Sequence, residues 1–197
     1  MKVKNKHIYL IHINKCGGTS MKGIMSNKDN VTIPKNDDII ELKKKDKWKN
    51  SIKVTITRNP YHRILSLHSM LIRDGVGITL QEVIDIITDD SIKYKVKNGG
   101  LNKGTKQHVK RHGLPMTHKH YGVVNEDLSL DVDYVFKLEE LHDKWDEFKE
   151  LTDIHSEIVI RNKSNNKNDI TIFSGEQIKK INEHYYNDFI CFKYEMI

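Results

Sequence analysis

A short segment at residues 14–20 carries residue types that can hold an anion. It reads Asn-Lys-Cys-Gly-Gly-Thr-Ser and directly follows an apolar run. Glycines let the backbone approach a ligand closely, and the first amides of a following helix point at an anion, which the helix dipole also favours. Lys15 lies within the turn, where its ammonium group can reach a phosphate or sulfate oxygen. In the Walker pattern the lysine follows the second glycine, so this segment uses similar physics without being that motif.

A second segment, residues 58–66, has the residue types of a phosphate clamp. Its sequence is Arg-Asn-Pro-Tyr-His-Arg-Ile-Leu-Ser, and its proline suits the first turn of a helix. Arg58 would then end a strand, and Ser66 would follow roughly two turns into the helix. We expect both at the crevice beside the carboxyl ends of the strands, where open α/β sheets bind ligands. An arginine fork together with a hydroxyl group favours phosphate.

The elements that must position these segments alternate between strands and helices. Residues 8–13 form an apolar run typical of a buried strand, and residues 52–57 alternate and are rich in β-branched side chains. We expect further strands at residues 134–138 and 157–160, and helices at residues 19–25, 60–73, 79–87, 141–151 and 178–186. This order predicts an α/β fold, P-loop-like and three-layered, with a mostly parallel central sheet flanked by helices. We expect a single domain over residues 1–197.

Several segments, taken in order, resemble the motifs of sulfotransferases that use 3′-phosphoadenosine 5′-phosphosulfate (PAPS). Residues 12–20 resemble the 5′-phosphosulfate loop, and residues 58–66 resemble the 3′-phosphate motif R-N-P-x-x-R-x-x-S. Supporting likenesses follow at residues 134–141, 161–164 and 185–194. The resemblance is to the carbohydrate branch, the heparan 2-O-sulfotransferase-like proteins of sulfotransferase family 2. Cys16 stands where threonine is usual and Asn14 where proline is usual, and neither change removes the lysine or the glycines.

This resemblance implies a role for each matching residue. Lys15 would stabilise the bridging oxygen of PAPS as negative charge develops there, and Arg58 and Ser66 would clamp the 3′-phosphate. The 5′-phosphate would be held by the rest of the loop: Cys16, Gly17, Gly18, Thr19 and Ser20. Three later residues would close over the nucleotide: Arg161, Asn162 and Lys163. The implied reaction is in-line transfer of a sulfuryl group from PAPS to a hydroxyl acceptor, with a glycan as the default and with no metal ion.

The motifs do not supply a general base. Many relatives carry a histidine between the two main motifs, whereas residues 14–61 contain none. Histidines gather later, in a region with little helical or strand pattern where we expect the acceptor to bind. His118 and His120 are therefore the candidates for the catalytic base. Two other interpretations stay open, surface histidines that bind an anionic acceptor and a metal site built on this pair. For His12 we consider a hydrogen-bonded core residue or a proton relay.

Composition indicates a globular protein rather than a membrane protein. Hydrophobic residues make up 37% of the chain and charged residues 30%, and no apolar run reaches the roughly 20 residues that span a bilayer. The first apolar run is too short for a signal peptide. The sequence therefore predicts a cytoplasmic protein, with a trimmed or viral form in a host-cell cytosol left open. Two cysteines do not make a disulfide framework.

The formal net charge of +6 favours anionic partners. We expect these to be the nucleotide co-substrate and an acidic or sulfated glycan, and we expect neither nucleic acid nor a membrane span. Two other function classes remain, a small-molecule kinase of the P-loop type and a non-enzymatic module that binds polyanions or nucleic acid. The position of the lysine argues against the kinase. The binding module leaves the glycine segment and the strand-end arginine unexplained.

Overall fold

The computed structural model describes residues 6–25, 28–89, 91, 103–156 and 169–197. The chain divides into two compact units, each with its own hydrophobic core. The first unit consists of Met1–Arg58 and Met116–Lys163, and the second consists of Asn59–Pro115 and Ser164–Ile197. Within the described ranges, no helix has the length and apolar character needed to cross a membrane.

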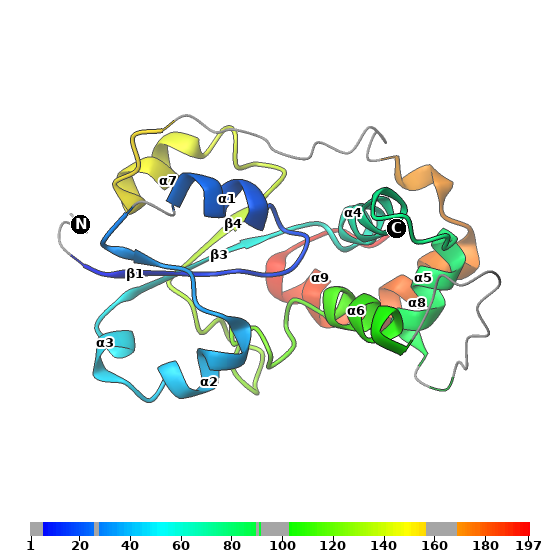
Figure 1. Ribbon diagram of the computed structural model, residues 1–197, viewed down its shortest axis with the longest axis horizontal. Helices are drawn as coiled ribbons and strands as arrows, with labels where there is room; N and C mark the ends of the chain where they lie inside the picture. Colours follow the sequence, from blue (N-terminus) through cyan, green and yellow to red (C-terminus); the bar gives the residue numbers. More distant parts are fainter. Residues whose placement is uncertain (1–5, 26–27, 90, 92–102, 157–168) are drawn as a thin grey trace. The chain divides into compact units, whose positions relative to one another are not determined.

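The first unit is built on a four-stranded parallel sheet flanked by helices (Figure 1). Its strands are β1 (Ile8–Ile11), β2 (Val31–Thr32), β3 (Ile52–Thr57) and β4 (Tyr134–Lys137), in the spatial order β2-β1-β3-β4. Its helical elements are α1 (Gly18–Met25), η1 (Asn36–Asp38), α2 (Ile39–Leu42), α3 (Asp46–Lys49) and α7 (Trp145–Thr152), where η denotes a 3₁₀ turn. The α/β fold expected from the alternation of elements is confirmed.

Alternation along β1 decides which layer of helices each side chain meets. On one face of the sheet, Leu10 shares a hydrophobic core with Met21 of α1 and Phe148 of α7. On the other face, the ring of Tyr9 packs against Trp48 of α3 with ring centroids 4.7 Å apart. Figure 1 shows α1 and α7 on one side of the sheet and α2 and α3 on the other. Because helices cover both faces, β1 is a continuous apolar run, as is typical of parallel strands.

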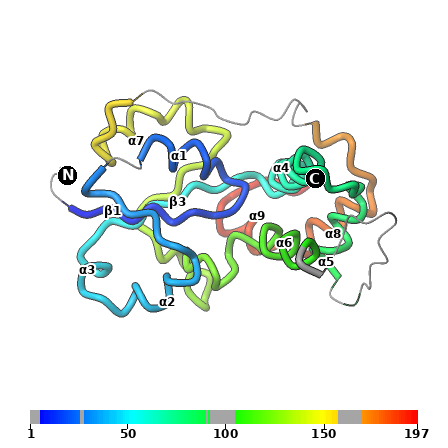
Figure 2. Tube along the Cα trace, in the orientation of Figure 1, coloured from blue at the N-terminus to red at the C-terminus, as the bar shows by residue number. Residues whose placement is uncertain are grey.

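The register of β1 and β3 brings their carboxyl ends to the same edge of the sheet. Ile11, the last residue of β1, pairs with Thr55, two residues before the end of β3. The buried hydroxyl of Thr55 donates a hydrogen bond of 3.1 Å to the carbonyl of Ile11. This bond gives the buried polar group a partner and ties the two strand ends together. Figure 2 shows the two strands side by side although they are far apart in the sequence.

The regular elements that the structure describes in the second unit are all helical. Its elements are α4 (Pro60–Arg73), α5 (Leu80–Thr88), α6 (Lys103–Gly113), η2 (Ile170–Ile172), α8 (Gly175–His184) and α9 (Tyr186–Phe192). Capping boxes open α5, at Thr79 and Glu82, and α8, at Ser174 and Gln177. In each box the two side chains bond each other's backbone amides, so two donors at the helix start are satisfied.

Two helices of the second unit differ from the sequence prediction. Helix α6 was not predicted, because its sequence is basic and polar. Among its residues whose burial the structure describes, Val109 is the one buried hydrophobic side chain, so no apolar stripe marks the helix. The expected last helix, at residues 178–186, is two helices that meet at Tyr185. The buried hydroxyl of Tyr185 donates to the carbonyl of Gly113, so a tertiary contact holds this junction. The strand expected at residues 157–160 lies outside the described residues.

Candidate active site

The chain reverses its direction across the sheet at β1. It passes from β1 through α1 to β2 on one side and later returns to β3 on the other side. In open α/β sheets such a reversal marks the place where ligands bind, beside the carboxyl ends of the strands. Residues 12–17, the glycine loop, follow the carboxyl end of β1, and Arg58 follows the carboxyl end of β3. The fold therefore brings two of the predicted anion-binding features to one edge.

The backbone of the glycine loop is left-handed at two points. Lys15 has a φ of 67° and Gly17 a φ of 81°, and the amide of Cys16 donates to the carbonyl of Ile13 at 3.3 Å. Glycine adopts a positive φ without penalty, whereas for lysine this conformation costs on the order of 1 kcal/mol. Strained backbone of this kind is concentrated at ligand-binding and active sites. A Cβ at position 17 would also lie 2.8 Å from Leu138.

Helix α1 begins at Gly18, immediately after the glycine loop. The amide of Met21 donates to the carbonyl of Gly17 at 3.2 Å and starts the helical pattern. The amides of Gly18 and Thr19 precede this bond, at the end of the helix where N–H groups have no acceptor in a preceding turn. The positive end of the helix dipole lies at the same place. This helix start can therefore hold an anion on its backbone.

Arg58 connects the two predicted segments. Its Nη1 donates to the backbone carbonyl of Lys15 at 3.3 Å, and both residues are half-buried. The guanidinium group has five N–H donors in a planar fork, so it can hold the loop and an anion at the same time. The contact places the guanidinium group of Arg58 beside the loop that carries the ammonium group of Lys15.

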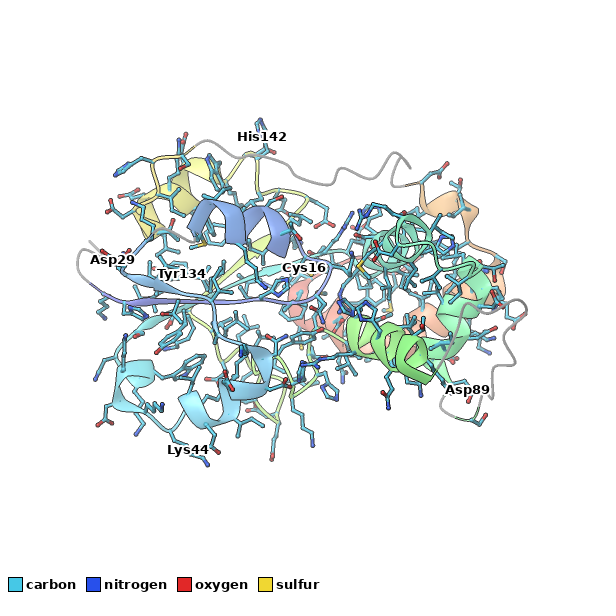
Figure 3. The ribbon with its side chains drawn as sticks, in the orientation of Figure 1. Cys16, Asp29, Lys44, Asp89, Tyr134 and His142 are labelled. Atoms are coloured by element: carbon cyan, nitrogen blue, oxygen red, sulfur yellow. The ribbon has the colours of Figure 1, made fainter. Side chains whose placement is uncertain are left out.

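Cys16, which is labelled in Figure 3, packs inward from the glycine loop that joins β1 to α1. Its side chain is 2% exposed, and its Sγ lies 3.8 Å from Sδ of Met116, which is fully buried. The thiol is therefore part of the packing around the loop. Met116 was not singled out from the sequence, and its contact anchors the stretch that carries His118 and His120 to the loop.

His118 is fixed by the backbone of its own segment. Its Nδ1 accepts the amide N–H of His120 at 3.1 Å, so the neutral ring carries its proton on Nε2. Burial, and secondly the charge of Lys119, lower the pKa of His118. The lowered pKa favours the neutral imidazole, but its one acceptor nitrogen, Nδ1, already bonds the amide of His120, so His118 can take a proton only when this bond breaks.

His120 lies near a carboxylate. Its Nδ1 lies 3.6 Å from Oδ1 of Asp37, and its ring meets Tyr121 nearly edge-on, with centroids 5.3 Å apart. Asp37 belongs to η1, which follows β2, so it also comes from the carboxyl side of the sheet. Sequence analysis missed Asp37, because β2 is only two residues long and the contact joins distant parts of the chain.

Arg63 and Ser66 of the 3′-phosphate motif lie on α4, in the second unit. Ser66 is half-buried. Arg63 is 2% exposed, and its Nη2 donates to the carbonyl of His112 at 3.1 Å. A cation at the end of α6 interacts favourably with the helix dipole, so Arg63 holds this helix. Arg58 belongs to the first unit and Ser66 to the second, so their joint clamp stays a prediction.

Three predicted residues, Arg161, Asn162 and Lys163, lie outside the described residues. Their closure over a nucleotide therefore stays a prediction. Among the side chains that the structure describes, no three of His, Cys, Asp or Glu gather as they would around a metal ion. The expectation that the reaction needs no metal is likewise left as a prediction.

Comparison with known proteins supplies the family. No curated protein matches the chain. A family model described as the sulfotransferase family matches residues 2–195 of the 197. The match covers the glycine loop, Arg58 and both candidate histidines, and it decides against a kinase and against a non-enzymatic binding module. The chain therefore belongs to the sulfotransferase family, and it is an enzyme of sulfuryl transfer.

Proposed function

We propose that the enzyme transfers a sulfuryl group from PAPS to a hydroxyl group of a glycan by in-line displacement. The observation that carries the proposal is the hydrogen bond of 3.3 Å from Arg58 to the carbonyl of Lys15. It joins a helix start suited to a 5′-phosphosulfate group with an arginine suited to a second phosphate. A donor with phosphate at both its 5′ and 3′ ends matches two such groups, whereas ATP lacks the 3′-phosphate.

The proposed reaction needs positioning and charge stabilisation more than covalent catalysis, like phosphoryl transfer. The acceptor oxygen forms a bond to sulfur as the bond between sulfur and the bridging oxygen breaks. Lys15 stabilises the negative charge that develops on that oxygen, and the amides at the start of α1 hold the 5′-phosphate. Adenosine 3′,5′-bisphosphate leaves with the electron pair of the broken bond.

The acceptor's proton goes to an imidazole, that of His118 or that of His120. Both histidines follow Met116, whose sulfur contacts Cys16 in the glycine loop. Burial lowers the pKa of His118, and its Nδ1 can take the proton once it releases the amide of His120. Nδ1 of His120 lies 3.6 Å from Oδ1 of Asp37. A positioned imidazole of this kind contributes about 100- to 10,000-fold to a rate. The net charge of +6 favours an acidic or already sulfated glycan as acceptor.

Thermal unfolding with different nucleotides tests the donor assignment. At 100 times its Kd, a ligand that binds only the folded state stabilises it by about 2.7 kcal/mol, which raises Tm by about 5–10 °C for a chain of this size. We expect this rise with adenosine 3′,5′-bisphosphate and a much smaller one with AMP at the same concentration. Equal stabilisation by AMP, or a larger effect of ATP with Mg²⁺, would contradict the proposal.

Turnover tests the reaction itself. The enzyme is incubated with PAPS and a panel of acidic and neutral glycans, and both adenosine 3′,5′-bisphosphate and the sulfated product are quantified. We expect the two products in equal amounts, and we expect the reaction to continue in EDTA because no step uses a metal ion. Nucleotide release without a sulfated glycan would count against the acceptor class, and loss of activity in EDTA would count against the metal-free mechanism.

A further inference from the structure

Gly18, the first residue of α1, is a glycine for a reason other than its backbone conformation. Gly17 has a φ of 81° and needs glycine for that reason, whereas Gly18 is not among the positive-φ glycines of the described residues. Glycine also weakens helices, by up to about 1 kcal/mol relative to alanine in a helix interior. Backbone geometry alone would therefore favour alanine at position 18.

The imidazole of His12 occupies the space that a side chain at position 18 would need. A Cβ built on Gly18 would lie 1.8 Å from Nε2 of His12 and 2.0 Å from its Cδ2. Both distances are far below any van der Waals contact, so a methyl group at position 18 must displace the ring. The ring of His12, rather than a turn, requires the glycine.

His12 reaches this place from the carboxyl end of β1. It is the first residue after the strand, is half-buried, and lines a small pocket together with Gly18, Cys16 and Lys22. Its ring therefore lies against the first turn of α1, which directly follows the glycine loop. Neither a hydrogen-bonded core residue nor a proton relay, the two roles that the sequence suggests for His12, explains its fit against Gly18.

We propose that His12 is a positioning residue of the donor site, and that its imidazole holds the first turn of α1 in the orientation that binds the 5′-phosphosulfate group. The inference rests on the proposed function, because it assumes that this turn binds the donor. His12 acts through the backbone of Gly18 and Thr19 and does not take part in proton transfer. Its removal therefore weakens donor binding and leaves acceptor binding unchanged.

The first test separates donor binding from acceptor binding. His12→Ala should raise the Kd for adenosine 3′,5′-bisphosphate and the KM for PAPS by about tenfold or more, because small misplacements of binding groups are costly. The KM for the acceptor should stay within twofold, and His12→Asn, which keeps a flat polar group, should recover part of the loss. An unchanged Kd in a folded His12→Ala variant, or an equal change in both KM values, would overturn the inference.

A double-mutant cycle tests the contact itself. Because a methyl group at position 18 displaces the ring, Gly18→Ala should weaken donor binding about as much as His12→Ala does. The double variant should be no weaker than either single variant, since the same contact is lost only once. Additive losses would show that Gly18 acts independently of His12 and would overturn the inference.

Gly175 supplies a matched control for the glycine. It is also the first residue of a helix, α8, and a Cβ there would meet nothing within 4 Å. Gly175→Ala should therefore leave donor binding unchanged, whereas a loss equal to that of Gly18→Ala would contradict the proposed contact. The wild-type protein separates the two proposals. If it does not bind adenosine 3′,5′-bisphosphate, the proposed function fails; if it binds and His12→Ala binds equally well, only the inference about His12 fails.

Discussion

Helices α1 and α4 both follow a parallel strand of the same sheet, yet their first turns are built differently. The chain enters α1 through Lys15 and Gly17 in left-handed conformations, and Gly17 has no side chain with which to cap the helix. The chain enters α4 at Pro60, and the side chain of Asn59 accepts the amide of Tyr61 at 3.0 Å. Since proline has no amide N–H and Asn59 already accepts the amide of Tyr61, a first turn built like that of α4 has fewer backbone donors to offer than one that begins at Gly18.

This difference indicates two ways of holding the two ends of one nucleotide. At α1 the anion is held by backbone amides, which any phosphate or sulfate group can use. For the predicted 3′-phosphate clamp the binding groups would be side chains, those of Arg58 and Ser66, and a planar guanidinium recognises a phosphate by its geometry. We therefore expect the start of α1 to determine how fast the sulfuryl group is transferred, and Arg58 and Ser66 to determine which nucleotide is bound.

The largest effect on the rate is expected when the loop before α1 loses the ammonium group of Lys15. Lys15→Ala should lower kcat by two or more orders of magnitude, about the loss seen when one preorganised donor to a developing charge is removed. The affinity for adenosine 3′,5′-bisphosphate, which lacks the sulfo group, should fall much less. Steady-state kinetics and titration calorimetry measure the two quantities. Lys49→Ala, at an exposed lysine of α3, serves as the control, and full turnover by Lys15→Ala would end this assignment.

A smaller effect on rate, and a larger one on selectivity, is expected at the end of β3. Arg58→Ala should raise the KM for PAPS by about 10- to 100-fold, the scale of a charged hydrogen bond. It should also bring the affinities for adenosine 3′,5′-bisphosphate and AMP close together. Because Arg58 donates to the carbonyl of Lys15, kcat should fall as well. Arg58→Lys keeps the charge without the fork and should recover only part of the selectivity; unchanged selectivity in Arg58→Ala would show that both ends bind through the backbone.

The local elements of both ends could be predicted from the sequence, and their contacts could not. Short local patterns predict these elements. They are the apolar run of β1, the β-branched residues of β3 and the proline that begins α4. The contact of Arg58 with Lys15 follows from strand order, which depends on where the chain crosses the sheet. The contact of His120 with Asp37 depends on a two-residue strand, too short for any periodic pattern.

Helix α6 shows another limit of sequence analysis. Its sequence, KGTKQHVKRHG, lacks an apolar stripe, so periodicity gives no helix signal. Its end is held by partners from elsewhere in the second unit, with Arg63 and Tyr185 donating to the carbonyls of His112 and Gly113. Arg63 is one of the fixed residues of the 3′-phosphate motif. In the structure its side chain binds the end of α6, through the carbonyl of His112.

Ser66 should contribute a few-fold to nucleotide selectivity. A neutral hydrogen bond is worth about 1 kcal/mol, so Ser66→Ala should weaken binding of adenosine 3′,5′-bisphosphate by about fivefold. Binding of AMP should not change, because AMP lacks the 3′-phosphate. Titrations with the two nucleotides measure the difference, and Ser69→Ala, also half-buried on α4, is the control. Equal losses for both nucleotides would place the hydroxyl somewhere other than at the 3′-phosphate.

The smallest functional effect is expected from the cap of α4. Asn59→Ala removes the acceptor for the amide of Tyr61 and should lower the free energy of unfolding by about 1 kcal/mol. Thr79→Ala, which removes the corresponding cap of α5, should cost a similar amount. Urea unfolding measures both, and donor binding should be unchanged in each variant. A loss of donor affinity in Asn59→Ala alone would mean that the start of α4 also offers its amides to the nucleotide, and the contrast between the two helix starts would then not hold.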